Sequence, residues 1–191
     1  PATSISYKNK VIKKTKFWSP DRINLQNLTE KEVIEKVKTE IDNAVKRRLV
    51  SDVPLGLFLS GGLDSTIIAE SASRQKSGLE AFTLGFEDSS YDETKNAVKI
   101  AKSFKLKQKI ETLSEERALE MLDEAINLLD EPLADPSILP QLLISKFTKQ
   151  NVTVCLSGDG GDELLVGYQH IKAHIILEKL SKKKKKVLYI F

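Results

Sequence analysis

The stretch SGGLDS, residues 60–65, follows directly on the apolar run VPLGLFL, residues 53–59. This order predicts a buried strand over 55–59, then a tight glycine turn, then a helix that begins near residue 64. The first turn of such a helix offers free backbone N–H groups and the positive end of the helix dipole. Both features suit a phosphate.

The residue after these glycines distinguishes the stretch from a Walker loop, GxxxxGK(S/T), because an aspartate, Asp64, takes the place of a lysine. A carboxylate beside a phosphate is tolerated when a cation lies between them, so Asp64 predicts Mg²⁺. The structural alternative is a Gly-Gly turn in which Asp64 or Ser65 only caps a helix.

A second acidic glycine stretch, SGDGGDE at residues 157–163, follows the apolar run VTVCL at 152–156. Asp159, Asp162 and Glu163 are crowded at another predicted helix start. Such carboxylates repel one another unless some cap the helix and others meet a metal. An N-cap is the structural alternative for Asp162, and a turn residue is the alternative for Asp159.

Strand-like and helix-like patterns alternate along the chain. Thr29 and Glu32 predict a capping box that opens a helix over about 30–50. The predicted strands lie at 55–59, 81–86, 107–112 and 152–156, and the predicted helices at 64–76, 91–104, 114–129, 140–149 and 162–180. The expected fold class is α/β, a doubly wound, mostly parallel, five-stranded-type sheet with helices on both faces.

Ligands of such sheets bind at the carboxyl ends of the strands that flank the topological switch point. Loops 60–65 and 157–163 both follow predicted strands. If these two strands are neighbours, the two loops face one site.

Composition limits the classes of function. The 191 residues, 40% of them hydrophobic, predict a domain at 29–191 after a polar, irregular arm or linker at 1–28. A net charge of +3 gives no electrostatic footprint for nucleic acid. The lysine run 182–186 is either a patch for nucleic acid or anionic lipid or, as we favour, a solvated helix end.

The single cysteine, Cys155, excludes a disulfide within the chain and fits a reducing cytoplasm. Its place in an apolar run predicts a small buried hydrophobe. Neither a signal peptide nor an apolar run near membrane length is evident, so we expect neither secretion nor a membrane span.

Three blocks carry a family resemblance. The loop 60–65 resembles the pyrophosphate loop SGGxDS of the PP-loop ATP pyrophosphatases. Residues 156–168, LSGDGGDELLVGY, resemble the SG(E/D)GxDExxxGY block of the C-terminal synthetase domain of glutamine-hydrolysing asparagine synthetases. Residues 86–93, FEDSSYDE, resemble the Fxxxx(Y/F)DE stretch between those blocks. The resemblance covers about residues 50–170 and implies an adenine nucleotide alpha-hydrolase-like fold.

The resemblance implies ATP and Mg²⁺ as cofactors of an AMP-forming amide ligase. Its site would consist of Asp64 and Asp162 for the metal and Asp159 as the catalytic residue near the acyl-adenylate. The residues implied to bind ATP or pyrophosphate are Phe58, Ser60, Gly61, Gly62, Leu63, Asp64, Ser65, Leu84, Ser157 and Gly158. Phe58 and Leu84 fit ordinary strand core equally well.

One further segment bears on the carboxylate that accepts the nitrogen. Residues 130–137, DEPLADPS, resemble the DEPxxDxS variant of asparagine-synthetase-like amidotransferases, or form a plain loop with a helix cap. We therefore expect a small-molecule carboxylate, with aspartate as the first candidate, and ammonia. Three alternatives stay open: an amidotransferase-like ligase with a different carboxylate acceptor, a PP-loop enzyme acting on tRNA, and a nucleotide-binding remnant or partner subunit without turnover.

Relatives of the glutamine-dependent type begin with a glutaminase domain that has an N-terminal cysteine nucleophile. Residue 1 here is proline, and 23 residues follow Tyr168. We therefore expect a fragment shortened at the C-terminus, which depends on a separate glutaminase domain or subunit for glutamine hydrolysis. Whether the chain forms a homo-oligomer is left open.

Overall fold

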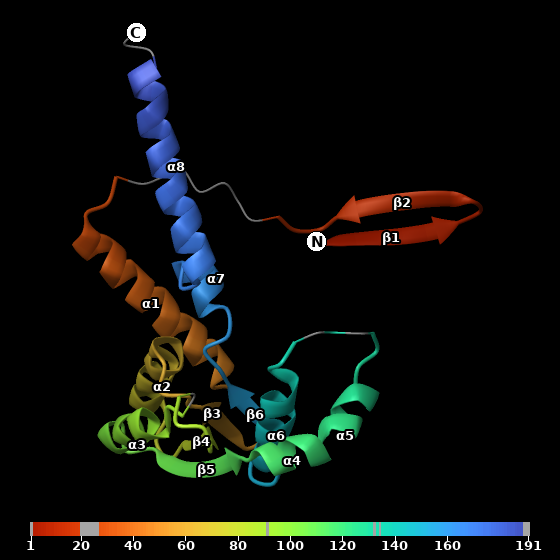
Figure 1. Cartoon of the computed structure of the whole chain (residues 1–191), viewed down its shortest axis with the longest axis vertical. Coiled ribbons are helices and arrows are strands. Elements are labelled where there is room, and N and C mark those ends of the chain that lie inside the picture. Colours follow the sequence, from red (N-terminus) through yellow and green to blue (C-terminus); the bar gives the residue numbers. More distant parts are fainter. Residues whose placement is uncertain (1, 20–26, 91, 132, 134, 189–191) are drawn as a thin grey trace. The chain divides into compact units, whose positions relative to one another are not determined.

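The computed structural model describes residues 2–19, 27–90, 92–131, 133 and 135–188, the last eight by backbone alone. The chain divides into two compact units, residues 1–37 and 38–191 (Figure 1). This division falls inside the first helix, and the predicted boundary at 28/29 stays a prediction.

The first unit contains an antiparallel hairpin of strands β1 (Thr3–Lys8) and β2 (Val11–Lys16). The irregular arm predicted for 1–28 is therefore wrong over these strands. The connection is a two-residue loop, and both of its residues, Asn9 and Lys10, have positive φ (51° and 63°). This is the conformation that closes tight hairpins, which the sequence reasoning missed because no glycine marks it. Residues 20–26 of the predicted arm lie outside the described residues.

Helix α1 (Glu30–Arg48) begins as predicted. The backbone N–H of Thr29 donates to Glu32 Oε2 at 2.7 Å, and the N–H of Glu32 donates to Thr29 Oγ1 at 3.4 Å. The reciprocal pair satisfies two backbone donors at the helix start, so the capping box is confirmed. The Thr29 hydroxyl, which donates to Glu32 Oε2 at 2.7 Å, and then the Thr29 N–H hold the pKa of Glu32 below its ordinary value.

The second unit is built on a four-stranded parallel sheet in the order β5-β4-β3-β6. Its strands are β3 (Leu55–Phe58), β4 (Glu80–Phe86), β5 (Lys107–Leu113) and β6 (Val154–Leu156). The α/β class and the parallel sheet are confirmed, with four strands among the described residues of this unit rather than five.

The helices show where the winding reverses. Helices α2 (Leu63–Gln75) and α3 (Thr94–Ser103) connect β3 to β4 and β4 to β5. The chain then passes through α4 (Glu115–Glu120), α5 (Leu122–Asn127) and α6 (Ile138–Lys149) before β6 joins the free side of β3. The switch point therefore lies between β3 and β6.

The core has two parts, one on each face of the sheet (Figure 1). Because successive strand residues point to opposite faces, Leu57 and Ala81 pack toward α1, α2 and α3. On the other face, the Phe82 ring meets Phe147 of α6 edge-on at 5.8 Å, and Leu84 packs against the cluster around Leu143.

Some predicted bounds differ from the structure. The helix predicted over 114–129 is divided at Met121, whose side chain is buried in the second cluster. The helix predicted from 91 begins at Thr94, because Asp92 accepts hydrogen bonds from the N–H groups of Phe86 and Thr94. The pKa of Asp92 is lowered, chiefly by its hydrogen bond from the Thr94 hydroxyl.

The helix predicted over 162–180 is in fact two helices, α7 (Gly161–Leu165) and α8 (Gln169–Leu188). Val166 ends α7 in the left-handed conformation, which no helix can continue. The backbone of α8 passes through the lysine run 182–186, but those side chains lie outside the description, so the solvated helix end stays a prediction. Among the described residues, no helix combines the length and apolar character of a membrane span.

Candidate functional site

The first glycine loop joins β3 to α2 and is closed by its own hydroxyl groups. The Oγ atoms of Ser60 and Ser65 are 3.0 Å apart, and the Gly62 N–H donates to Ser60 Oγ at 3.2 Å. The Ser65 and Thr66 hydroxyls donate back to the Gly62 carbonyl at 3.1 and 2.6 Å. Gly62 is the N-cap of α2, and no side chain caps the helix. Neither Asp64 nor Ser65 therefore caps α2. The backbone N–H groups in the first turn of α2 remain available to a ligand.

Gly61 needs to be glycine for two reasons. Its φ is 94°, where L side chains are strained. A Cβ there would also lie 3.0 Å from Glu93 O and from Ala97 N, at the start of α3. The last residue of the third block, Glu93, therefore lies against the first loop.

Glu93 was given no role by sequence reasoning, although it ends that third block. Its Oε2 would lie 3.9 Å from a Cβ on Gly62, so this carboxylate is beside the loop. The position of Glu93 within the block was the signal that could have drawn attention to it. Tyr91 of the same block lies outside the described residues.

The second glycine loop follows β6. Ser157 Oγ donates to Asp159 Oδ2 at 2.8 Å, and the Asp159 N–H donates to Ser157 Oγ at 3.4 Å. The exposed Asp159 therefore stabilises its own turn, as the alternative for this residue predicted. Gly160, with φ 90°, is the N-cap of α7, and no side chain caps that helix. The N-cap alternative for Asp162 is therefore wrong.

The two loops meet at the switch point, as predicted. β3 and β6 pair in parallel with Leu57 opposite Leu156, so the chain leaves both strands at the same edge. A Cβ on Gly158 would lie 2.7 Å from Ser65 N, and one on Gly161 would lie 2.5 Å from Asp64 Cγ. The second loop thus lies directly on the start of α2, around the Asp64 side chain.

The segment after α7 turns back on Asp162. The Gly167 N–H donates to Asp162 O at 3.0 Å. Tyr168 Oη donates to Glu163 Oε1 at 2.7 Å, which raises the pKa of Tyr168 and lowers the pKa of Glu163. The Tyr168 ring also stacks on His170, with centroids 5.3 Å apart.

The two aspartates predicted to bind metal are Asp64 and Asp162, and each is half-buried. Among the described residues, neither carboxylate has a hydrogen bond or an ion pair. No group of three or more metal-ligating side chains is present in the part of the chain that the structure describes. Mg²⁺ at phosphate-containing sites uses one or two carboxylates together with phosphate oxygens, so this pair fits the metal.

The other predicted site residues have structural roles too. Leu84 packs in the second core cluster, as its core alternative predicted, while Phe58 is half-buried at the end of β3. In the 130–137 loop, the Ser137 N–H donates to Asp135 Oδ1 at 2.9 Å, and this bond lowers the pKa of Asp135. Pro132 and Ala134 of that loop lie outside the described residues.

Cys155 lies in β6 as expected but is half-buried, not fully buried. Burial raises the pKa of its thiol to about 11, so the group is protonated at neutral pH. A protonated thiol is a poor nucleophile, which agrees with a packing role.

A comparison with known protein families identifies the family of this chain. The family described as asparagine synthase matches residues 36–187. The chain belongs to the asparagine synthase family. The resemblance inferred from the three blocks is thereby confirmed.

Two curated relatives illustrate how this asparagine synthase family chain compares with longer proteins. A glutamine-hydrolysing asparagine synthetase of Bacillus subtilis is 34% identical over 80% of this chain and 24% of that protein. The glutamine-hydrolysing asparagine synthetase of Bos taurus is 32% identical over 83% of this chain and 31% of that protein. The chain thus spans 24% and 31% of the lengths of these two relatives.

Among solved structures, an NMN synthetase from Francisella tularensis aligns with this asparagine synthase family chain with a TM-score of 0.48 and 14% identity. The alignment covers 74% of this chain and 59% of that one.

Proposed function

We propose that this chain forms the ATP-binding part of an ATP-dependent amide ligase. It binds ATP with Mg²⁺, activates a small-molecule carboxylate, with aspartate as the first candidate, and releases pyrophosphate. Ammonia then displaces AMP, which forms the amide.

One observation carries the proposal. The loop after β3 and the loop after β6 lie against each other at the switch point, and Asp64 lies beneath Gly161. A phosphate-binding helix start and two carboxylates without hydrogen-bond partners therefore share one edge of the sheet. A nucleotide polyphosphate with a bridging divalent cation is the ligand that suits this combination.

The residues of the first loop bind the pyrophosphate portion of ATP. The Ser60 and Ser65 hydroxyls and the backbone N–H groups around Gly61, Gly62 and Leu63 donate hydrogen bonds to it. For the Gly62 N–H and the Ser65 hydroxyl, these bonds replace the ones that they form within the loop. Gly61 and Gly62 let the backbone approach closely. These fixed donors stabilise the negative charge that grows on the leaving pyrophosphate and hold the α-phosphorus in line with the attacking carboxylate.

The residues of the second loop complete the site. Asp162 and Asp64 would hold Mg²⁺ as carboxylate ligands, and the bound metal would neutralise negative charge on the phosphate oxygens. Ser157 and Gly158 form part of the nucleotide wall, together with Phe58 and Leu84. Asp159, already hydrogen-bonded to Ser157, orients the incoming acceptor.

The nitrogen source is inferred from the relatives. The curated relatives named above are glutamine-hydrolysing, and this chain spans about a quarter to a third of their lengths. We propose that ammonia reaches this site from a glutaminase domain or subunit.

The activity is tested by exchange of radiolabelled pyrophosphate into ATP, with a panel of carboxylic acids that includes aspartate. Exchange that depends on aspartate supports the synthetase. Exchange with another acid keeps the ligase chemistry but changes the acceptor. ATP binding without exchange for any acid would identify a nucleotide-binding remnant and reject the ligase.

The metal site is tested with Asp64→Asn and Asp162→Asn, which keep the side-chain shape but remove its charge. We expect each to weaken Mg²⁺-dependent ATP binding by about tenfold or more, measured by calorimetry. Asp123→Asn, on the exposed surface of α5, is the matched control and should bind ATP as wild type does. Normal Mg²⁺ dependence in both site variants would reject the metal assignment.

A further inference from the structure

Two glycines near the candidate metal site are not required by backbone conformation. In the segment 157–168, the positive φ values occur at Gly160 (90°) and Val166 (61°). Gly161 and Gly167, their immediate neighbours, have φ outside the left-handed region. Any L-residue could adopt the backbone at these two positions, so the reason for glycine is the space that a side chain would take.

In both cases that space is filled by a carboxylate. A Cβ on Gly161 would lie 2.5 Å from Asp64 Cγ, and 2.7 and 2.9 Å from its two oxygens. A Cβ on Gly167 would overlap Asp162 Oδ1 and lie 2.6 Å from its Cγ. Real Cβ atoms do not approach other atoms this closely, so each carboxylate occupies a place that only glycine leaves open.

We propose that Gly161 and Gly167 are positioning residues that hold the carboxylates of Asp64 and Asp162 in their metal-binding orientations. This inference rests on the proposed function, in which those two carboxylates hold Mg²⁺. A side chain at either glycine pushes the neighbouring carboxylate away. At Gly161 the displaced atoms all belong to the end of a side chain, whereas a Cβ on Gly167 would also lie 3.0 Å from Asp162 Cα. Metal ligands are oriented by the groups packed around them, and losing such support weakens metal binding.

Three glycines separate this effect from a general loss of stability. At Gly158 a Cβ would meet backbone atoms, Ser65 N at 2.7 Å and Asp64 C at 2.9 Å, which cannot move independently of the fold. At Gly78, between α2 and β4, φ is 75° and no atom lies within 4 Å of a Cβ, so alanine there introduces only backbone strain. At Gly161 the atoms that it meets are the free end of the Asp64 side chain, which can rotate away at little cost to folding.

The test compares Gly161→Ala with Gly78→Ala and Gly158→Ala by ATP calorimetry with Mg²⁺ or with EDTA, and by thermal unfolding without nucleotide. We expect Gly161→Ala to lose about tenfold or more of the Mg²⁺-dependent ATP affinity, with a small change in melting temperature. Gly78→Ala, outside both loops, should melt earlier but bind ATP as wild type does. Gly158→Ala should lose the most stability.

A double-mutant cycle tests whether the effect passes through the carboxylate. In the Asp64→Asn background, Gly161→Ala should cause little further loss of affinity, and Gly167→Ala should behave likewise with Asp162→Asn. Wild-type affinity in Gly161→Ala, or losses that add, would overturn the inference while leaving the proposed function intact. A wild-type chain that binds no ATP with Mg²⁺ would instead reject the proposed function and this inference with it.

Discussion

Val166 is the residue with the most unusual backbone near the candidate site. Its φ of 61° and ψ of 42° place a β-branched residue in the left-handed region, at the end of α7. Left-handed backbone costs an L-residue about 1–2 kcal/mol because Cβ crowds the neighbouring carbonyl. The adjacent Gly167 could adopt this conformation freely, but its position is needed for the Asp162 carboxylate. The strain at Val166 is therefore a consequence of where the glycine has to be.

Relief of this strain should be measurable. We expect Val166→Gly to raise the free energy of unfolding by about 0.5–1 kcal/mol, in urea titrations, because glycine adopts this conformation without a clash. Val98→Gly is the control, since Val98 is 41% exposed within α3 and glycine has a lower helix propensity than valine, so this variant should lose stability. If Val166→Gly and Val98→Gly lower the free energy of unfolding by the same amount, Val166 is not strained.

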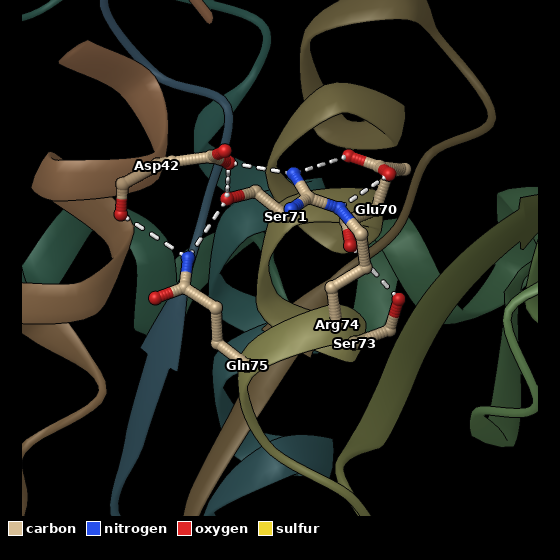
Figure 2. Close-up of polar contacts among 6 residues, drawn as sticks. All are labelled: Asp42, Glu70, Ser71, Ser73, Arg74 and Gln75. Atoms are coloured by element: carbon tan, nitrogen blue, oxygen red, sulfur yellow. Dashed lines mark hydrogen bonds and ion pairs between the residues drawn. The ribbon is translucent and has the colours of Figure 1, made fainter. Parts of the chain in front are cut away.

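At the scale of elements, a polar network connects α1 to α2 (Figure 2). Asp42 Oδ1 accepts hydrogen bonds from Ser71 Oγ at 2.5 Å and Arg74 Nη2 at 2.7 Å. Gln75 Nε2 donates to Asp42 O and Ser71 Oγ, both at 3.1 Å, while Arg74 Nε forms an ion pair with Glu70 at 2.6 Å. Ser71 is fully buried, and a buried hydroxyl without a hydrogen-bond partner would destabilise the fold, so Asp42 stabilises it by accepting this hydrogen bond. The network holds the helix whose first turn contains Asp64.

This network makes a prediction about acid. The hydrogen bonds from Ser71 and then Arg74 lower the pKa of Asp42 from its ordinary 3.8. The contribution of Asp42 to the free energy of unfolding is therefore complete at pH values above 3.8. This contribution declines as the pH falls through 3.8 toward the lowered pKa, because Asp42 takes up a proton in the unfolded chain before it does so in the folded one. Urea titrations of wild type and Asp42→Asn should therefore show a difference in unfolding free energy that is largest near neutral pH and shrinks in acid.

Asp123→Asn is the matched control for that series, because Asp123 is exposed on α5 and its side chain has no hydrogen bond or ion pair among the described residues. Its unfolding free energy should follow wild type at every pH. If Asp42→Asn also follows wild type at every pH, the network contributes nothing to stability.

At the scale of the whole molecule, the two units differ in what holds them together. In the unit of residues 38–191, β3 and β4 are buried between helices, and Leu57 and Phe82 are each 1% exposed. In the unit of residues 1–37, every residue of β1 and β2 is exposed. A lone two-stranded hairpin is marginally stable in water, whereas strands inside a covered sheet open only when the fold opens.

Hydrogen exchange followed by mass spectrometry should resolve this difference. Peptides that cover β3 and β4 should exchange slowest, and those that cover 3–16 should exchange within the fastest phase of the chain. Peptides from the exposed end of α1 provide an internal comparison for a helix held by local hydrogen bonds. Protection of the hairpin equal to that of β3 would show that another contact stabilises it.

Features that depend on a few neighbouring residues could be predicted. The Thr29–Glu32 capping box, the glycine turn at 60–65 and the alternation of helices and strands each follow from hydrogen bonds or spacing within one or two turns of chain. The family also followed, because three short blocks occur in the right order. The hairpin and the break at Val166 could not be predicted, since both depend on residues with positive φ that are not glycine.

The sequence by itself determined the chemistry of two acidic glycine loops and the strands that precede them, because loop composition and apolar runs are local properties. Only the tertiary structure decided that β6 pairs with β3, and so that these loops, about a hundred residues apart, share one edge of the sheet. It also decided that Asp64 lies against Gly161 and Asp162 against Gly167. Such contacts arise from the packing of distant segments, and no local pattern of residues specifies them.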